Sequence, residues 1–349
     1  MGITLKEIAK MANVHRSTVD KVLHDREGVS DEVRKRIKQI IKETGYTPNS
    51  LGQALQKKSE VIRIAAVLLK VDALNILKEG INQALKAYEG FNIDIQYNII
   101  NYFDEAAQLS VLQSLLKDRI DGIILSPIHT ESIQKAIDKI IAAGIPVVTT
   151  MNFDIPSSNR LCFVGQDALR AGMIAASLVD GLLSGRGKVL LITATGQTDT
   201  ISYSEDRRVG FENMIKSEYP NIEIAGYIVG YDDPIIIERE VSSLLKDSDW
   251  PDGIFITGGG VGVVGKLLKE YDKEHRIKVV CFECYPEIIQ LIQEGVIHFT
   301  IDSNMKSQGY LPIEILINYL VYRKKPPTSE IYTNSEIVVK GSLHKSEKK

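Results

Sequence analysis

The residues after position 58 alternate short apolar segments with longer segments of helical periodicity, and this alternation limits the fold more than any other feature. The apolar segments are rich in Val, Ile and Leu, so both faces of each strand are expected to be buried. Such strands, separated by helices of about 10–15 residues, are typical of parallel sheets with helices on both faces. We predict two successive doubly wound α/β units, with strands at residues 62–69, 93–99, 122–125, 147–149, 161–164, 188–192, 222–229, 253–257 and 278–282.

The first 58 residues differ in charge from the rest of the chain. They contain 12 Lys and Arg against 7 Asp and Glu, which leaves 30 against 38 for residues 59–349. A basic segment on an acidic body indicates a module that binds a polyanion. Alternatively, the basic residues of this segment form an ordinary solvated surface that binds no partner.

This basic segment carries the start and stop signals of three short helices. Thr4 and Glu7 form a capping box, so the first helix is expected directly after Thr4. The second is expected from Arg16 to about residue 24, and the third follows an N-cap at Ser30 and ends at Gly45. The short joint between the first two helices matches a helix-turn-helix, whose second helix enters the DNA major groove, while a generic three-helix bundle is the alternative.

Three sequence blocks, TLKEIAKMANVHRSTVDKVL, VSDEVRKRI and GYTPN, resemble the head of the lac-repressor family of transcription factors over residues 3–58. The resemblance implies an all-α helix-turn-helix domain at residues 1–47 and a hinge helix and linker at residues 48–60. It implies base-reading roles for Arg16, Ser17 and Lys21, and both cations are able to donate to guanine O6 and N7. The residues implied to hold phosphates or form the hinge are Thr18, Ser30, Tyr46, Asn49 and Leu55, the last as a minor-groove wedge.

Two positions depart from the family pattern in this segment. Asp20 stands where the family often has Ser, and a carboxylate faces phosphates poorly, so we expect a differently read operator or a pairing of Asp20 with Arg16 or Lys21. Gly52 stands where the family usually has Ala, which costs about 0.5–1 kcal/mol of helix stability. The hinge is therefore expected to be weakly helical in the absence of DNA.

Polar residues follow the predicted strands, at the sheet edge where ligands bind in folds of this kind. These positions resemble the sugar-binding cleft of type I periplasmic binding proteins, the core that lac-repressor relatives share. The resemblance implies that Arg207 clamps ligand hydroxyls and that Glu283 takes a pair of hydroxyls, although Glu283 could also face solvent. Further candidates for the effector site are Asp72, Asn152, Gln166, Asp167 and Ser303.

The loop at residues 258–260 is a departure in this part of the chain. Gly258, Gly259 and Gly260 stand where the family commonly has Asn or Asp, so recognition by a side chain from this loop is lost. Either a larger ligand fills the space, or the ligand approaches the backbone closely.

The ligand-binding core is expected at residues 61–341. Its first lobe is predicted from residues 61–159 and 287–324 and its second from residues 160–286 and 325–341, with a disordered tail at residues 342–349. We predict a cytoplasmic homodimer that binds a pseudo-palindromic operator, because two-fold proteins match two-fold sites. A sugar or sugar derivative, acting as inducer or co-repressor, would close the lobes and change operator affinity.

Two other classes of protein compete with a regulator. Gly260, Gly262 and Gly265 form a G-x-G-x-x-G motif between predicted strands, with Glu283 as the acid, as in NAD-binding oxidoreductases. The late place of this motif in the chain and the lack of a candidate hydride-transfer site count against an oxidoreductase. The basic head and the lack of a signal peptide count against a solute-binding protein, and no apolar run is long enough for a membrane span. No catalytic residue, cofactor, metal site or disulfide framework is predicted from the six His and three Cys.

Overall fold

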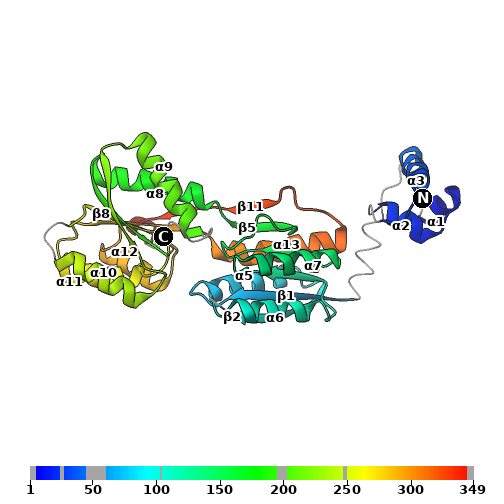
Figure 1. The fold of residues 1–349 in the computed structure, drawn as a ribbon, viewed down its shortest axis with the longest axis horizontal. Helices are drawn as coiled ribbons and strands as arrows, with labels where there is room; N and C mark the ends of the chain where they lie inside the picture. The colour runs from blue at the N-terminus through cyan, green and yellow to red at the C-terminus, as the bar shows by residue number, and fades with distance from the viewer. Residues whose placement is uncertain are drawn as a thin grey trace, which may run out of the picture. The chain divides into compact units, whose positions relative to one another are not determined.

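The computed structural model describes residues 5–23, 27–44, 60–102, 104–194, 203–246 and 250–343. The chain divides into two compact units, Met1–Lys57 and Lys58–Lys349, which we call the head and the core and describe separately. The boundary between them falls inside the linker predicted at residues 48–60. In Figure 1 the head is blue and the core runs from cyan to red.

The described part of the head consists of three helices, α1 (Leu5–Met11), α2 (Arg16–Leu23) and α3 (Asp31–Thr44). Asn13 lies in the turn between α1 and α2 with a φ of +50°, a left-handed conformation that Asn tolerates better than most residues. The three predicted helices are confirmed to within about two residues. Apolar side chains from all three helices form one small core, which consists of Ile8, Ala9, Ala12, Val19, Val22 and Ile37.

The first sheet of the core contains six parallel strands in the order β11-β5-β4-β3-β1-β2. Its strands are β1 (Val61–Leu69), β2 (Asn92–Ile100), β3 (Gly122–Leu125), β4 (Val147–Thr149), β5 (Cys162–Gln166) and β11 (Glu330–Thr333). Four helices belong to this lobe, α5 (Leu74–Ala87), α6 (Glu105–Leu115), α7 (Glu131–Ala142) and α13 (Met305–Tyr322). They lie on both faces of the sheet (Figure 1), as the uniformly apolar strands predict.

The second sheet contains six strands in the order β12-β10-β9-β8-β6-β7, all parallel except β12. Its strands are β6 (Gly187–Thr193), β7 (Ile222–Val229), β8 (Gly253–Ile256), β9 (Lys278–Phe282), β10 (Phe299–Asp302) and β12 (Glu336–Val338). Its helices are α8 (Ala168–Leu183), α9 (Tyr203–Glu218), α10 (Pro234–Lys246), α11 (Val261–Tyr271) and α12 (Pro286–Glu294), followed by the 3-10 helix η1 (Lys340–Leu343).

The predicted lobe boundaries were wrong. Strand β5 pairs with β4 and belongs to the first lobe, whereas α12 and β10 belong to the second, so the chain crosses between lobes after β5, after β10 and after β11. The reason is that an apolar strand has the same pattern in either sheet. The strands β10, β11 and β12 were missed because they are short, and β11 and β12 are edge strands with exposed residues such as Tyr332 and Ile337.

The predicted tail also begins too early. Ser342 lies in η1, and Leu343 packs against the apolar cluster of the second lobe. Residues 344–349 lie outside the described residues.

Each lobe contains a pair of helices that meet at glycines. A Cβ added at Gly80 of α5 would lie 1.9 Å from the backbone oxygen of Lys306 in α13. In the second lobe, a Cβ at Gly172 of α8 would lie 2.0 Å from the backbone oxygen of Arg207 in α9, and Gly210 of α9 is equally close to α8. Only glycine allows the backbones to approach this closely, and the second pair places Arg207.

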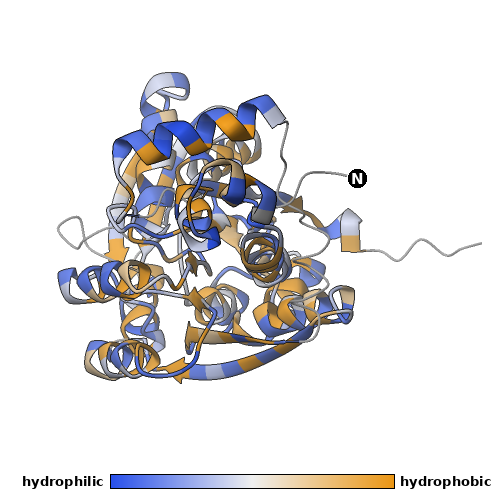
Figure 2. Ribbon diagram, turned by 90° about the vertical axis from the view of Figure 1, so that its right-hand side faces the viewer, coloured by the Kyte–Doolittle hydropathy of each residue, from blue (hydrophilic) through white to orange (hydrophobic). Residues whose placement is uncertain are grey.

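Apolar clusters fill the space between each sheet and its helices. In the second lobe, β6, β8 and β9 pack on one face against α8 and α9 and on the other against α10, α11 and α12. The helices are amphipathic, and Figure 2 shows hydrophobic and hydrophilic residues alternating along them. No helix in the described part of the chain is long and apolar enough to cross a membrane.

Candidate functional site

A cleft of about 450 Å³ lies where the carboxyl ends of strands from both sheets meet. The first lobe contributes the segments that follow β1, β2 and β4, and the second contributes the start of α9 and the segments that follow β7, β8 and β9. This is the edge at which the parallel topology predicts a ligand site.

Arg207 is the most buried charged side chain at the cleft, with an exposed fraction of 1%. Its Nη2 donates to Glu283 Oε1 at 2.9 Å and to Gln166 Oε1 at 2.7 Å, and its Nη1 donates to the backbone oxygen of Thr257 at 2.9 Å. The guanidinium lies over the ring of Phe282, 3.6 Å from its centroid. Arg207 therefore connects the second lobe to Gln166, the last residue of β5.

Glu283 uses both carboxylate oxygens within the protein. Oε1 accepts from Arg207, and Oε2 accepts from the hydroxyl of Ser303 at 2.7 Å. Ser303 follows β10, where the chain crosses between lobes. The structure thus brings together four of the predicted effector residues, Arg207, Glu283, Gln166 and Ser303, but as a bonded network rather than as free ligand contacts.

The other three predicted effector residues have different surroundings. Asp72 lines the cleft, exposed, on the first lobe. Asn152 also lines it, but its Oδ1 accepts from the backbone N–H of Gln166 at 2.8 Å. Asp167 does not line the cleft; it caps α8 by accepting from the backbone N–H of Arg170 at 3.0 Å and lines a neighbouring hollow of about 410 Å³.

Aromatic residues of the cleft were largely missed from the sequence. Tyr102 and Phe153 of the first lobe lie 5.6 Å apart between ring centroids, and Phe153 meets Tyr203 of the second lobe at 5.4 Å, edge to face. Burial raises the pKa of Tyr102 to about 12 and that of Tyr285 further, so both phenols stay neutral hydrogen-bond donors. The available signal was the position of these aromatic residues in the segments that follow β2 and β4, or at the start of α9 and α12.

Asp232, after β7, occupies the space left by the glycine loop. Its Oδ1 accepts from the backbone N–H of Gly259 at 2.6 Å. A Cβ at Gly258 would lie 2.8 Å from the same oxygen, and one at Gly259 would lie 2.9 Å from it. The side chain that the glycine loop lacks is therefore replaced by a carboxylate from the segment after β7.

Several of these cleft residues have unusual backbone conformations. Positive φ values occur at ten non-glycine residues of the described chain, and five of them line the cleft: Met151, Asn152, Tyr231, Asp232 and Glu283. Backbone strain of this kind concentrates at functional sites.

The G-x-G-x-x-G motif has a packing role in this structure. A Cβ at Gly262 would lie 2.2 Å from Glu287 Oε1, and a Cβ at Gly265 would lie 2.4 Å from Leu291 of α12. The glycines let α11 pack against α12. A carboxylate beside the start of α11 also opposes a pyrophosphate there.

Five of the predicted DNA contacts of the head are among the described residues, and these five are exposed or half-buried. Arg16, Ser17 and Lys21 are exposed on α2, and Thr18 is half-buried. Ser17 shares a hydrogen bond of 2.8 Å with His15 Nδ1, and Ser30 is exposed at the start of α3. The predicted contacts Tyr46, Asn49 and Leu55 lie outside the described residues.

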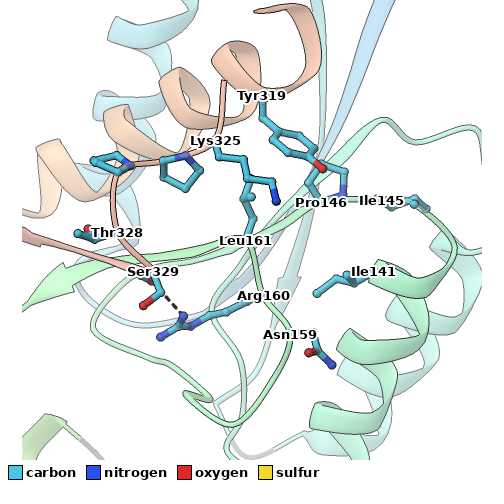
Figure 3. A pocket seen from close by; sticks show the side chains of 13 residues that line it. Ile141, Ile145, Pro146, Asn159, Arg160, Leu161, Tyr319, Lys325, Thr328 and Ser329 are labelled. Atoms are coloured by element: carbon cyan, nitrogen blue, oxygen red, sulfur yellow. Dashed lines mark hydrogen bonds between the residues drawn. The ribbon is translucent and has the colours of Figure 1, made fainter. Parts of the chain in front are cut away.

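Another hollow, of about 430 Å³, lies at the amino ends of β4, β5 and β11 in the first sheet (Figure 3). Its buried cation, Arg160, forms an ion pair with Asp154 and donates to the backbone oxygen of Ser329 at 3.0 Å. Tyr319 and Lys325 also line it. The described residues that line this hollow all belong to the first lobe, so a ligand there would contact one lobe alone.

Two family models match the chain. Residues 4–49 match the model described as bacterial regulatory proteins, lacI family, and residues 32–325 match the periplasmic binding protein domain. The second match covers most of the chain and includes every described residue of the cleft.

Individual relatives agree with these matches. The ribose operon repressor of Haemophilus influenzae is 25% identical over 263 residues, 74% of each chain. The sucrose operon repressor of Lactococcus lactis is 25% identical over 289 residues, 80% of this chain and 83% of that one. A sugar-binding protein of a sugar ABC transporter from Bacillus halodurans superposes with a TM-score of 0.70 at 25% identity, over 80% of this chain and 97% of that one. The chain belongs to the periplasmic binding protein domain family, and it carries a helix-turn-helix head of the lacI family of bacterial regulatory proteins.

Proposed function

We propose that the protein is a transcriptional repressor whose affinity for operator DNA is controlled by a carbohydrate bound between the two lobes of the core. The observation that carries this proposal is the combination, in one chain, of a lacI-family head with a cleft formed by two sheets. The names of the ribose and sucrose operon repressors support it. The protein acts by binding rather than by catalysis.

On the DNA side, α2 enters the major groove. Arg16, Ser17 and Lys21 read base edges, and Thr18 and Ser30 hold phosphates. These side chains are exposed or half-buried, which leaves their polar groups available to DNA. Two heads of a homodimer bind one pseudo-palindromic operator.

On the effector side, the cleft combines polar groups with aromatic faces. Tyr102, Phe153 and Tyr203 offer apolar surface to the C–H face of a sugar ring, while Asp72, Asn152 and other polar groups meet its hydroxyls. Sites for small ligands commonly combine apolar walls with a few placed polar groups.

The lobe crossings are where effector binding would act. Arg207 binds Gln166 beside the first crossing, and Glu283 binds Ser303 beside the second. A ligand that contacts both lobes shifts the equilibrium between their open and closed arrangements. The change in operator affinity is limited by the difference between the ligand's affinities for these two arrangements.

A two-step experiment tests this proposal. Selection of DNA sequences by the full-length protein should yield a palindromic operator, and a thermal-shift screen of pentoses, hexoses and their derivatives should yield a stabilising sugar. Fluorescence anisotropy then measures operator binding with and without that sugar. An unchanged operator affinity at saturating sugar would contradict the proposal.

A further inference from the structure

The hollow beside the cleft is also lined by both lobes. It has a volume of about 410 Å³, and we call it the side hollow. The first lobe contributes β5, β11 and the segments that follow β3 and β4, and the second contributes the starts of α8 and α9. Three residues line both the cleft and the side hollow, namely Asn152, Phe153 and Tyr203. The two spaces therefore share one wall of side chains.

This shared wall carries polar groups that have no partner in the described part of the chain. The Asn152 side chain is buried, with an exposed fraction of 8%. Its Oδ1 accepts from the backbone N–H of Gln166, so its Nδ2 is left as a donor, and this donor has no hydrogen bond to a described residue. The hydroxyl of Tyr203 has none there either. Because buried polar groups are nearly always paired, these two groups indicate a ligand at the wall.

The shared wall is also a contact between the lobes. Phe153 belongs to the first lobe and Tyr203 to the second, and their ring centroids lie 5.4 Å apart, edge to face. Opening of the lobes separates these rings, which joins the cleft to the side hollow. One ligand can then occupy both spaces.

The side hollow combines an aromatic face with carboxylates. Tyr332 of the edge strand β11 is 50% exposed, and its ring lies 6.5 Å from that of Phe163. Asp206 forms no hydrogen bond or ion pair within the described part of the chain, and Asp167 uses only one oxygen, as the cap of α8. No group of three or more His, Cys, Asp or Glu among the described residues could hold a metal ion. Aromatic faces pack against the C–H groups of sugars and carboxylates accept their hydroxyls, so this lining suits a sugar ring.

We propose that the effector is an oligosaccharide of at least two sugar units, with one unit in the cleft and the next in the side hollow. This inference rests on the proposed carbohydrate-binding function and names the class of carbohydrate. The Nδ2 of Asn152 donates to an oxygen near the linkage between the units. The second unit packs on Tyr332, and its hydroxyls donate to Asp206 and Asp167. Because the side hollow is lined by both lobes, the second unit adds contacts that hold the lobes together.

Calorimetry on the full-length protein tests the proposal. The probes are sucrose, maltose, cellobiose, lactose, melibiose and trehalose, each compared with its constituent monosaccharides. Leu169→Trp places an indole in the side hollow, and Tyr332→Ala removes its exposed aromatic face. The matched controls are Leu116→Trp and Tyr322→Ala, which change a leucine and a tyrosine of similar exposure outside both spaces. Melting temperatures of the four variants check that each is folded.

We expect at least one disaccharide to bind about ten- to a hundredfold more tightly than either of its monosaccharides. Leu169→Trp should remove this advantage, and Tyr332→Ala should reduce it about three- to tenfold, because a packed aromatic face is lost. The affinity for monosaccharides should change less than about twofold in both variants, and the controls should change neither affinity.

Two results would overturn the inference and leave the proposed function standing. One is a monosaccharide that binds as tightly as every disaccharide of the panel. The other is a disaccharide advantage that survives in Leu169→Trp, or in full in Tyr332→Ala, since a disaccharide held in the cleft alone is indifferent to both changes. If no sugar of the panel binds, the inference and the proposed function both fail.

Discussion

The head and the core place their functional side chains in opposite environments. The candidate DNA contacts Arg16 and Lys21 are exposed on α2, above a core of a few small side chains. The candidate effector contacts Arg207 and Glu283 are buried and bonded to each other. Exposed contacts are therefore expected to be separable from folding, whereas buried ones serve binding and stability together.

The largest effect is expected from Arg207→Ala. Removal of one partner of a buried ion pair leaves the other charge uncompensated, which costs about 3–5 kcal/mol. The single Trp of the chain, Trp250, lies in the core, so its fluorescence during denaturation by urea reports on the core alone. The variant should also lose its response to the effector.

The matched control for that experiment is Arg239→Ala. Arg239 pairs with Glu240 on the surface, with exposed fractions of 70% and 45%, and surface pairs contribute about 0–1 kcal/mol. Equal losses of stability in the two variants would show that burial of the Arg207 pair is unimportant.

The second prediction concerns the helix contact that places Arg207. Gly172→Ala puts a Cβ 2.0 Å from the Arg207 backbone oxygen, so α8 and α9 must separate, and we expect a loss of about 1–3 kcal/mol. Gly181→Ala on the same helix is the control, because nothing lies within 4 Å of its Cβ, and it should stabilise the core by about 0.5–1 kcal/mol. Thermal unfolding of both variants measures these effects. If Gly172→Ala were as stable as Gly181→Ala, the backbones of α8 and α9 would not be in close contact at Gly172.

The third prediction concerns the head. Arg16→Ala and Lys21→Ala should each cost about 1–3 kcal/mol of binding at one base position of the operator, with the unfolding free energy changed by less than about 0.5 kcal/mol. Competition binding with operators substituted one base pair at a time measures this. Equal losses of binding free energy on operator and on random DNA would mean that these residues contact phosphates and do not read bases.

Much of the fold could be predicted because its strands are buried on both faces. The segments 122–125, 147–149, 222–229 and 278–282 match β3, β4, β7 and β9 at both ends. The assignment of β5 to a sheet could not be predicted, since Cys162–Gln166 is apolar in either lobe. The sheet that a strand joins depends on its pairing with strands that are distant in the sequence.

The candidate site was predicted in part, for a similar reason. Arg207 and Glu283 were found from a family resemblance, and both line the cleft. Asp232 was missed, because Tyr231, Asp232 and Asp233 have the composition of an ordinary turn. Its role becomes visible only when the space above Gly258 is known.

The last prediction is a pH dependence of core stability that arises at Asp302. Burial, and then the charge of Glu283, raise the pKa of Asp302 from 3.8 to about 6. Because the folded state holds this proton more tightly than the unfolded state, the contribution of Asp302 is complete below about pH 4 and is lost as the pH rises through 6. Asp302→Asn is neutral throughout, so its melting temperature relative to that of the wild type should rise between pH 4 and pH 7. His298 acts in the opposite sense in both proteins, since burial lowers its pKa from 6.5 to about 4 and its contribution is lost as the pH falls. Because His298 is present in both proteins, its contribution cancels in the difference between their melting temperatures. If this difference did not change with pH, Asp302 would have an ordinary pKa in the folded core.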